Sequence, residues 1–238
     1  MWIKICGLND LATVRQIAEL RPDAIGVNFY ERSVRSVSPE AAQQIADVLP
    51  PGIQVIGVFV EASAETIRQT AAICRLGGIQ LHAAGHSDAL GELGDRPETF
   101  ATGPKRIRAF QVGARGLAPL AEYFERDRGR TFAADAYLID AQVDGMYGGT
   151  GKTVSWELLR NEYQTEEWPP LILAGGLCPE NVGEAIDAVR PWGVDVASGV
   201  ESSPGVKDPA LVARFIEEAR RAFAKLNLEI KARDSVIE

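Results

Sequence analysis

Short apolar runs recur along this chain at nearly even intervals, with longer amphipathic stretches between them. Eight runs stand out: Trp2–Cys6, Ala24–Phe29, Gln54–Val60, Gly78–His82, Arg106–Val112, Ala136–Asp140, Leu171–Ala174 and Val194–Ser198. Successive runs begin roughly 22 to 35 residues apart, which is the size of one strand–helix unit. The sequence therefore predicts strands and helices in regular alternation.

Helix-start signals lie between the runs. Asp10 precedes a periodic stretch that reaches Leu20, and Ser38 precedes Pro39, which suits the first position of a helix. Helices between parallel strands cover the sheet, and eight units suggest that the sheet closes. The predicted fold class is α/β, a single (β/α)8 TIM barrel. An open doubly wound sheet is the main alternative.

The length of the chain agrees with one barrel. It has 238 residues, of which 46% are hydrophobic, and a (β/α)8 barrel takes roughly 250. Residues 1–238 are expected to form one domain. The segments Asp88–Pro104 and Glu157–Pro170 are interpreted as connections that could contain short helices, rather than as domain boundaries. Ala210–Leu226 is interpreted as the last helix. The charged tail Glu229–Glu238 is expected to fray.

Composition excludes several classes of function. The net charge is -8 and no basic stripe is present, which argues against a nucleic-acid partner. No apolar run reaches the ~18 residues of a membrane span, and the N-terminus is interpreted as a strand rather than a signal peptide. Cys6, Cys74 and Cys178 form neither a metal pattern nor a disulfide framework, which favours a cytoplasmic location.

The last two apolar runs end in small residues, Gly175-Gly176 and Ser198-Gly199. In a (β/α)8 barrel, the loops after the last two strands commonly bind a phosphate, and glycine lets backbone N–H groups approach an anion. A small phosphorylated substrate is therefore expected. The glycine-rich stretch 148–153 lacks the spacing of a nucleotide-binding P-loop, because position 146 is Met146. A loop that closes on a phosphate is the better interpretation.

Reacting groups in such a barrel lie at the carboxyl ends of the strands. Cys6 and Asp140 end the first and sixth runs, so they could face each other and act as an acid–base pair. Cys6 could equally be a small core residue, although Gly7 and a helix start follow it, and Asp140 could cap a helix or anchor a loop. The catalytic interpretation requires the pKa of Cys6 to be lowered and that of Asp140 to be raised.

Two further polar residues lie at strand ends, each with two interpretations. Arg35 follows the second run within a short polar segment, and His82 ends the fourth. Arg35 could face the substrate or be a solvated surface charge. His82 could bind the substrate or be a hydrogen-bonded core imidazole.

Strand alternation adds one prediction. If Cys6 faces the barrel mouth, then Lys4 points inward one layer below it. A buried lysine needs a partner, and the eighth strand, which closes against the first, offers Asp195. The sequence therefore predicts a buried Lys4–Asp195 pair that raises the positive potential beneath the site.

Taken together, these segments resemble the phosphoribosylanthranilate isomerase family along nearly the whole chain. The motifs that carry the resemblance are Lys4-Ile5-Cys6-Gly7, Gly57-Val58-Phe59-Val60, Gln80-Leu81-His82, Gly148-Gly149-Thr150-Gly151-Lys152, Leu173-Ala174-Gly175-Gly176-Leu177, Pro179-Glu180-Asn181-Val182, Val194-Asp195-Val196 with Ser198-Gly199-Val200-Glu201, and Gly205-Val206-Lys207-Asp208. Each motif alone is weak, and their order and spacing make the match specific.

The resemblance implies an Amadori rearrangement of N-(5-phosphoribosyl)anthranilate without cofactor or metal. It places the general base on Cys6, the general acid on Asp140 and a substrate contact on Arg35. The phosphate would lie on backbone groups of three loops, at Gly149 to Gly151, at Gly175-Gly176 and at Ser198-Gly199.

Three departures from the family pattern are present, at Ser36, at residues 83–86 and at Cys178. The first two lie near the expected mouth and bear on substrate identity. The alternatives are therefore a barrel isomerase of a related phosphoribosyl substrate and a non-catalytic barrel that binds a phosphate ligand. The sequence is compatible with a monomer or a homodimer.

Overall fold

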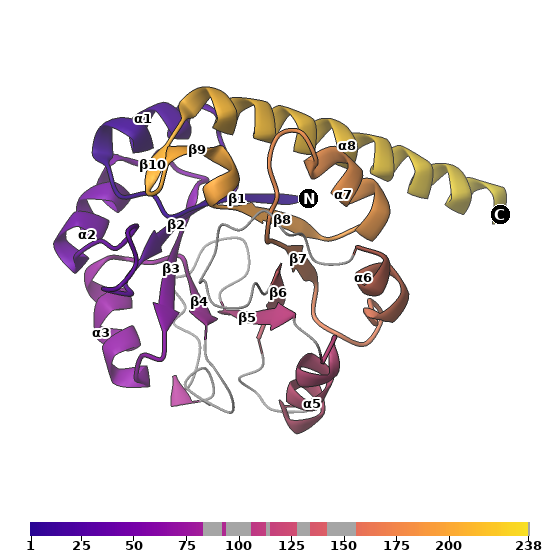
Figure 1. Cartoon of the computed structure of the whole chain (residues 1–238), viewed down its shortest axis with the longest axis horizontal. Helices are drawn as coiled ribbons and strands as arrows, with labels where there is room; N and C mark the ends of the chain where they lie inside the picture. The colour runs from indigo at the N-terminus through magenta and orange to yellow at the C-terminus, as the bar shows by residue number, and fades with distance from the viewer. Residues whose placement is uncertain (83–91, 94–105, 113–114, 128–133, 142–155, 238) are drawn as a thin grey trace.

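The computed structural model describes residues 1–82, 92–93, 106–112, 115–127, 134–141 and 156–237. Within them, eight parallel strands close into a barrel in chain order, because β1 pairs with β8 as well as with β2 (Figure 1). The barrel strands are β1 (Trp2–Cys6), β2 (Ala24–Asn28), β3 (Gln54–Val60), β4 (Gly78–His82), β5 (Arg106–Val112), β6 (Ala136–Ala141), β7 (Leu171–Leu173) and β8 (Gly193–Val196). The predicted (β/α)8 barrel is confirmed, and the open sheet is excluded.

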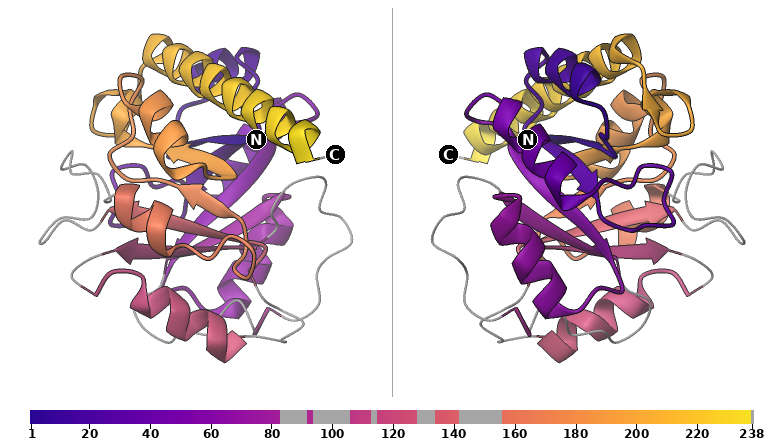
Figure 2. Two further views of the ribbon diagram at one scale, coloured as in Figure 1. Left: turned by 90° about the vertical axis from the view of Figure 1, so that its right-hand side faces the viewer. Right: turned by 90° about the vertical axis from the view of Figure 1, so that its left-hand side faces the viewer.

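Helices lie outside the strands (Figures 1 and 2). They are α1 (Leu11–Glu19), α2 (Pro39–Val48), α3 (Ala64–Ile73), α5 (Ala118–Asp127), α6 (Trp156–Glu162), α7 (Val182–Val189) and α8 (Pro209–Ile237). The helix starts that the sequence indicates are confirmed, since Asp10 accepts a hydrogen bond from the backbone N–H of Thr13 at 2.7 Å. Ser38 likewise accepts one from Ala41 at 3.2 Å.

Two segments near the end of the chain differ from expectation. The eighth strand stops at Val196, and a 3-10 turn, η1 (Ser198–Val200), leads into a small antiparallel hairpin of β9 (Glu201–Ser203) and β10 (Val206–Lys207). The last helix continues to Ile237 instead of ending at Leu226, because no glycine or proline follows Leu226 to stop it. Fraying of the tail 229–238 stays a prediction. Figure 1 shows this helix extending past the strands.

The alternation of side chains along each strand gives the barrel two cores. One lies between strands and helices and includes Ile3, Ile5, Tyr137 and Ile139. The other lies inside the barrel and contains Trp2, Ala136 and Leu138 among others. Its described members come from the strands and from Ala174, the residue that follows β7. Because side chains alternate, Lys4, Cys6 and Asp140 belong to the inward-facing set.

Candidate active site

Cys6 is the last residue of β1 and its thiol is half-buried. Its partner in register on β2 is Gly26. A Cβ atom at Gly26 would lie 2.8 Å from the sulfur of Cys6 and 3.1 Å from Cε of Lys4. The absence of a side chain at Gly26 therefore leaves the space into which both β1 side chains project.

Lys4 and Asp195 form an ion pair inside the barrel, one layer below Cys6. Lys4 is fully buried, its Nζ donates a hydrogen bond to Oδ1 of Asp195 at 2.9 Å, and the two residues are partners in register between β1 and β8. The predicted pair is confirmed. Burial lowers the pKa of Lys4, but the charges of Asp195 and of a Cys6 thiolate outweigh burial, so that the net pKa is raised.

The pKa of Cys6 is raised in the free protein. The catalytic interpretation of the sequence predicted a lowered pKa, and that prediction is wrong for the free protein. Burial is the largest cause, because it penalises the thiolate, and the carboxylate of Asp195 acts in the same direction. The positive charges of Lys4 and Lys207 oppose both. The predicted positive potential beneath the thiol is therefore present, and it is smaller than the effect of burial.

Asp140 lies near the carboxyl end of β6, on the inward-facing side with Ala136 and Leu138, and is half-buried. In the closed barrel, β7 and β8 separate β6 from β1. Asp140 and Cys6 therefore reach the same mouth from strands on different sides of the barrel. That placement suits two groups that act on one ligand from opposite sides.

Arg35 lies beside Cys6, in the segment that follows β2. The stem of Arg35 covers Gly7, since a Cβ atom on Gly7 would fall 2.4 Å from Cδ of Arg35. Gly7 has φ +80°, which a residue with a side chain rarely adopts. The guanidinium binds both carboxylate oxygens of Glu201, at 2.7 and 2.6 Å. The surface-charge alternative for Arg35 is thus excluded, and its contact with substrate stays a prediction.

Glu201 also binds Lys207, with 2.5 Å between the ammonium nitrogen and Oε1. Burial raises the pKa of Glu201, but the hydrogen bonds from Arg35 and Lys207 outweigh burial and lower it overall. Burial also lowers the pKa of Lys207. The motifs contain Glu201 and Lys207, but the sequence alone assigned neither a role. The signal available was two opposite charges on either side of the turn at Pro204-Gly205.

His82 ends β4 and points inward with Gln80, two residues earlier. The Nε2 atoms of the two side chains lie 2.7 Å apart. Burial, with the positive charges of Lys4 and Arg108, lowers the pKa of His82 to about 4. His82 is therefore a neutral imidazole at neutral pH. This hydrogen bond agrees with the core interpretation, and substrate binding by His82 stays a prediction.

The two described phosphate-loop candidates lie against each other. Gly175 and Gly176 follow β7 with φ +83° and +66°. A Cβ atom at Gly199 would fall 1.8 Å from the carbonyl oxygen of Leu177, so only glycine allows the turn after β8 to pack on the loop after β7. Asn181 braces that loop, because its amide donates to the carbonyl of Gly176 at 2.9 Å. Ser198 begins the packed turn.

Some expected site residues lie outside the described residues. They are Gly149 and Gly151 in the third phosphate loop and residues 83–86 at the mouth. Ser36, which is described, forms a bridge with Asn28. Cys178 donates its backbone N–H to Asn181 at 2.8 Å.

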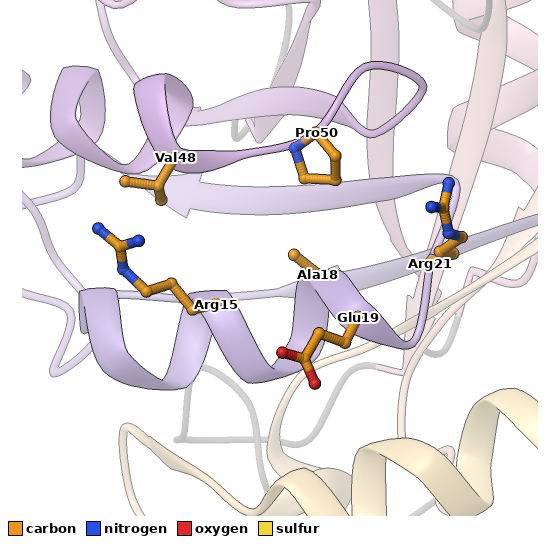
Figure 3. A pocket seen from close by; sticks show the side chains of 6 residues that line it. All are labelled: Arg15, Ala18, Glu19, Arg21, Val48 and Pro50. Atoms are coloured by element: carbon orange, nitrogen blue, oxygen red, sulfur yellow. The ribbon is translucent and has the colours of Figure 1, made fainter.

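A hollow lies away from the barrel mouth, in the described part of the chain. It has a volume of about 390 Å³ and lies between α1 and α2 (Figure 3). Its lining includes Ala18, Glu19 and Val48, which come from the carboxyl-terminal parts of these helices.

No group of three or more His, Cys, Asp or Glu side chains among the described residues could hold a metal ion. None of the helices described is both long and apolar enough to cross a membrane.

A closed parallel barrel with a thiol, a carboxylate and glycine-rich loops at its mouth defines a (β/α)8-barrel enzyme that acts on a small anionic substrate. The family model "N-(5'phosphoribosyl)anthranilate (PRA) isomerase" matches residues 3–218. The chain belongs to the N-(5'-phosphoribosyl)anthranilate isomerase family.

Individual relatives agree with this assignment. The chain is 40% identical over 220 residues to the N-(5'-phosphoribosyl)anthranilate isomerase of Geotalea uraniireducens, covering 92% of this chain and 98% of the relative. It is 42% identical over 223 residues to that of Magnetococcus marinus, covering 92% and 95%.

Solved structures show the same likeness. The crystal structure of phosphoribosyl anthranilate isomerase from Thermotoga maritima has a TM-score of 0.78 with this chain and 35% identity, covering 92% of this chain and 98% of that one. A complex of such an isomerase with reduced 1-(o-carboxyphenylamino)-1-deoxyribulose 5-phosphate has a TM-score of 0.74 and 32% identity, with the same coverage.

The chain is therefore an isomerase of tryptophan biosynthesis. Its reaction converts N-(5'-phosphoribosyl)anthranilate to 1-(o-carboxyphenylamino)-1-deoxyribulose 5-phosphate.

Proposed function

We propose that Cys6 is the general base of this isomerisation and Asp140 its general acid. One observation supports the assignment above all others. Both side chains belong to the inward-facing set at the carboxyl ends of their strands, and two strands separate those strands in the closed barrel. A sugar ring bound at the mouth would lie between the two groups, as general acid–base catalysis requires.

The chemistry needs two proton transfers. Asp140, in its protonated form, donates to the ring oxygen of the furanose as the C1–O bond breaks, which gives a Schiff base. Cys6, as a thiolate, then takes the proton from C2 and gives an enolamine that tautomerises to the ketone. Each transfer is worth roughly a hundred- to ten-thousand-fold in rate. Neither transfer calls for a metal or a cofactor, because side chains supply and accept both protons.

Phosphate binding is proposed for the backbone of Gly175, Gly176, Ser198 and Gly199. The packing of Gly199 on Leu177 supports this role, because it brings both turns into one surface. The loop with Gly149 and Gly151 would complete the phosphate site. Arg35 would contact the rest of the substrate from beside Cys6, and neutral His82 would contribute a hydrogen bond.

The setting of the enzyme is also a proposal. A cytoplasmic location is supported by three cysteines that form no disulfide in the structure. Association as a monomer or a homodimer stays open, and the T. maritima relative is described as dimeric. The partner expected beyond a second copy is the small phosphorylated substrate alone.

The test follows the loss of anthranilate-type fluorescence when freshly generated phosphoribosylanthranilate meets the purified protein. Cys6→Ala and Asp140→Asn should each lose a hundredfold or more in turnover, roughly, with unchanged circular dichroism. Cys74→Ser is the matched control, because this buried thiol lies in the outer core and donates to the carbonyl of Pro39.

Near wild-type turnover in either site variant would remove that residue from its role. No fluorescence loss with the wild-type protein, together with stabilisation by inorganic phosphate, would indicate a related phosphoribosyl substrate or a non-catalytic binder.

A further inference from the structure

Two cations flank the carboxyl end of β1 and share one carboxylate. Arg35 lies on the side of β2, with its stem over Gly7. Lys207 lies on the side of β8, because its Nζ donates to the carbonyl oxygen of Ala197 at 3.0 Å. Glu201 binds both cations and is itself buried, with 4% of its side chain exposed.

Strand register places Lys207 near the level of Cys6. Ile5 pairs with Val196 across β1 and β8, so the next residues along the two strands are Cys6 and Ala197. Adjacent strands lie about 4.8 Å apart. A side chain that binds the carbonyl of Ala197 is therefore beside the end of β1, where the thiol is.

We propose that Lys207 and Glu201 form a positioning pair for the catalytic base. Glu201 holds the ammonium of Lys207 and the guanidinium of Arg35 on the Cys6 side of the mouth, and the net positive charge of this trio favours the thiolate. The proposal rests on the assignment of Cys6 as the general base.

The charge balance supports this role. Beneath Cys6, the carboxylate of Asp195 offsets part of the positive charge of Lys4. Among the residues that the structure describes, Lys207 and Arg35 share the carboxylate of Glu201, so this group keeps one positive charge. Lys207 lowers the pKa of Cys6 against the effect of burial, and the charge of Arg35 also interacts with the Cys6 thiolate. The charge trio therefore adds a net positive charge beside the thiol, which favours the thiolate.

Glu201 has a second effect, which is geometric. It accepts the backbone N–H of Gly205 at 3.2 Å and so fixes the hairpin that carries Lys207. Through Arg35 it reaches the segment after β2, and through Lys207 it reaches the turn that begins the phosphate site. One side chain thus connects three segments that border the mouth.

The first test titrates the thiol without catalysis. In a background with Cys74→Ser and Cys178→Ser, only Cys6 reacts with iodoacetamide, and its alkylation rate against pH gives its pKa. Lys207→Gln keeps a donor for the carbonyl of Ala197 and removes the charge. The thiol pKa should rise in this variant and return toward the wild-type value in Lys207→Arg.

Lys225→Gln is the control, because Lys225 pairs with Asp187 on the exposed side of α8. It should leave the titration unchanged. An unchanged titration in folded Lys207→Gln would overturn the proposal, and so would a rise in Lys225→Gln of equal size.

The second test is kinetic. The acid limb of the pH–rate profile should move to higher pH in Lys207→Gln. At a fixed acidic pH, the rate should then fall about tenfold for each pH unit by which the limb has moved. Glu201→Gln should raise KM more than it lowers kcat, because Arg35 loses its partner. If both variants only reduce the amount of folded protein, without the shift of the acid limb or the increase in KM, the positioning role is overturned.

These outcomes are separate from those of the proposed function. If Cys6→Ala keeps full turnover, Cys6 is not the base, yet the alkylation titration still reports whether Lys207 acts on the thiol. If Cys6→Ala is inactive and the titration does not respond to Lys207, only the positioning pair is wrong.

Discussion

Replacement of Lys4 by methionine should be among the most damaging single changes in this barrel. The substitution keeps most of the side-chain volume but leaves the carboxylate of Asp195 inside the barrel without its 2.9 Å partner. Lys4 is fully buried and the side chain of Asp195 is 8% exposed, so water cannot replace the lost interaction. Removing one partner of a buried pair costs about 3–5 kcal/mol.

That cost corresponds to a fall in melting temperature of roughly 6 to 20 °C for a chain of this length. Urea unfolding followed by circular dichroism measures the change in the free energy of unfolding. Adding Asp195→Asn to Lys4→Met should recover part of the loss, because the unpaired charge is then removed. Lys225→Met is the matched control and should unfold like the wild type, because its ion pair with Asp187 is exposed.

The pH dependence of this contribution has a definite sign. Burial lowers the pKa of Lys4, but Asp195 raises it above its ordinary value of 10.5 overall. The stabilisation is therefore complete below about pH 10.5 and is lost as pH rises through the folded-state value. A loss of less than about 1 kcal/mol in Lys4→Met, well below the expected range, would refute this account of the pair. Failure of Asp195→Asn to recover any stability would refute it as well.

Two other changes test the loops and the inward-facing histidine. Gly199→Ala should force the turn after β8 away from the carbonyl of Leu177, with an overpacking cost of about 1–3 kcal/mol. The increase in melting temperature that inorganic phosphate causes should then be smaller than in the wild type. An unchanged increase would contradict a phosphate surface shared by the two turns. Because the pKa of His82 is lowered to about 4 from 6.5, the unfolded chain binds a proton first as pH falls, so stability should decline between these values. His82→Gln should flatten that decline in urea titrations at several pH values; parallel curves for the two proteins would show that His82 does not cause it.

The barrel itself was largely predictable, because its strands are short apolar runs between helix-start signals. Trp2–Cys6 and Gln54–Val60 form strands with the predicted bounds. The Lys4–Asp195 pair could also be predicted, since alternation along β1 and closure against β8 are enough to bring the two together. Prediction succeeded where a regular period decides which residues are neighbours.

It failed where neighbours depend on irregular backbone. The charges of Glu201 and Lys207 meet because a turn folds β9 onto β10, and no period in the sequence indicates that Arg35 will reach the same carboxylate. The predicted direction of the Cys6 pKa shift was wrong for a related reason. The direction of the shift depends on whether the effect of burial on the pKa exceeds the effect of the two nearby positive charges. The extent of burial depends on packing, which the order of residues in the sequence does not show.

The pairing of β1 with β8 has a consequence for biosynthesis. Lys4 and Asp195 are 191 residues apart in sequence, so a ribosome completes almost the entire barrel before the lysine can meet its counter-ion. Until β8 emerges, the nascent chain has two unpaired sheet edges, β1 and β7, and β1 carries the uncompensated cation of Lys4. Such edges invite pairing with other chains. Molecular chaperones are therefore most useful to this chain late in translation, when the first seven strands have been synthesised and β8 has not yet paired with β1 to close the barrel.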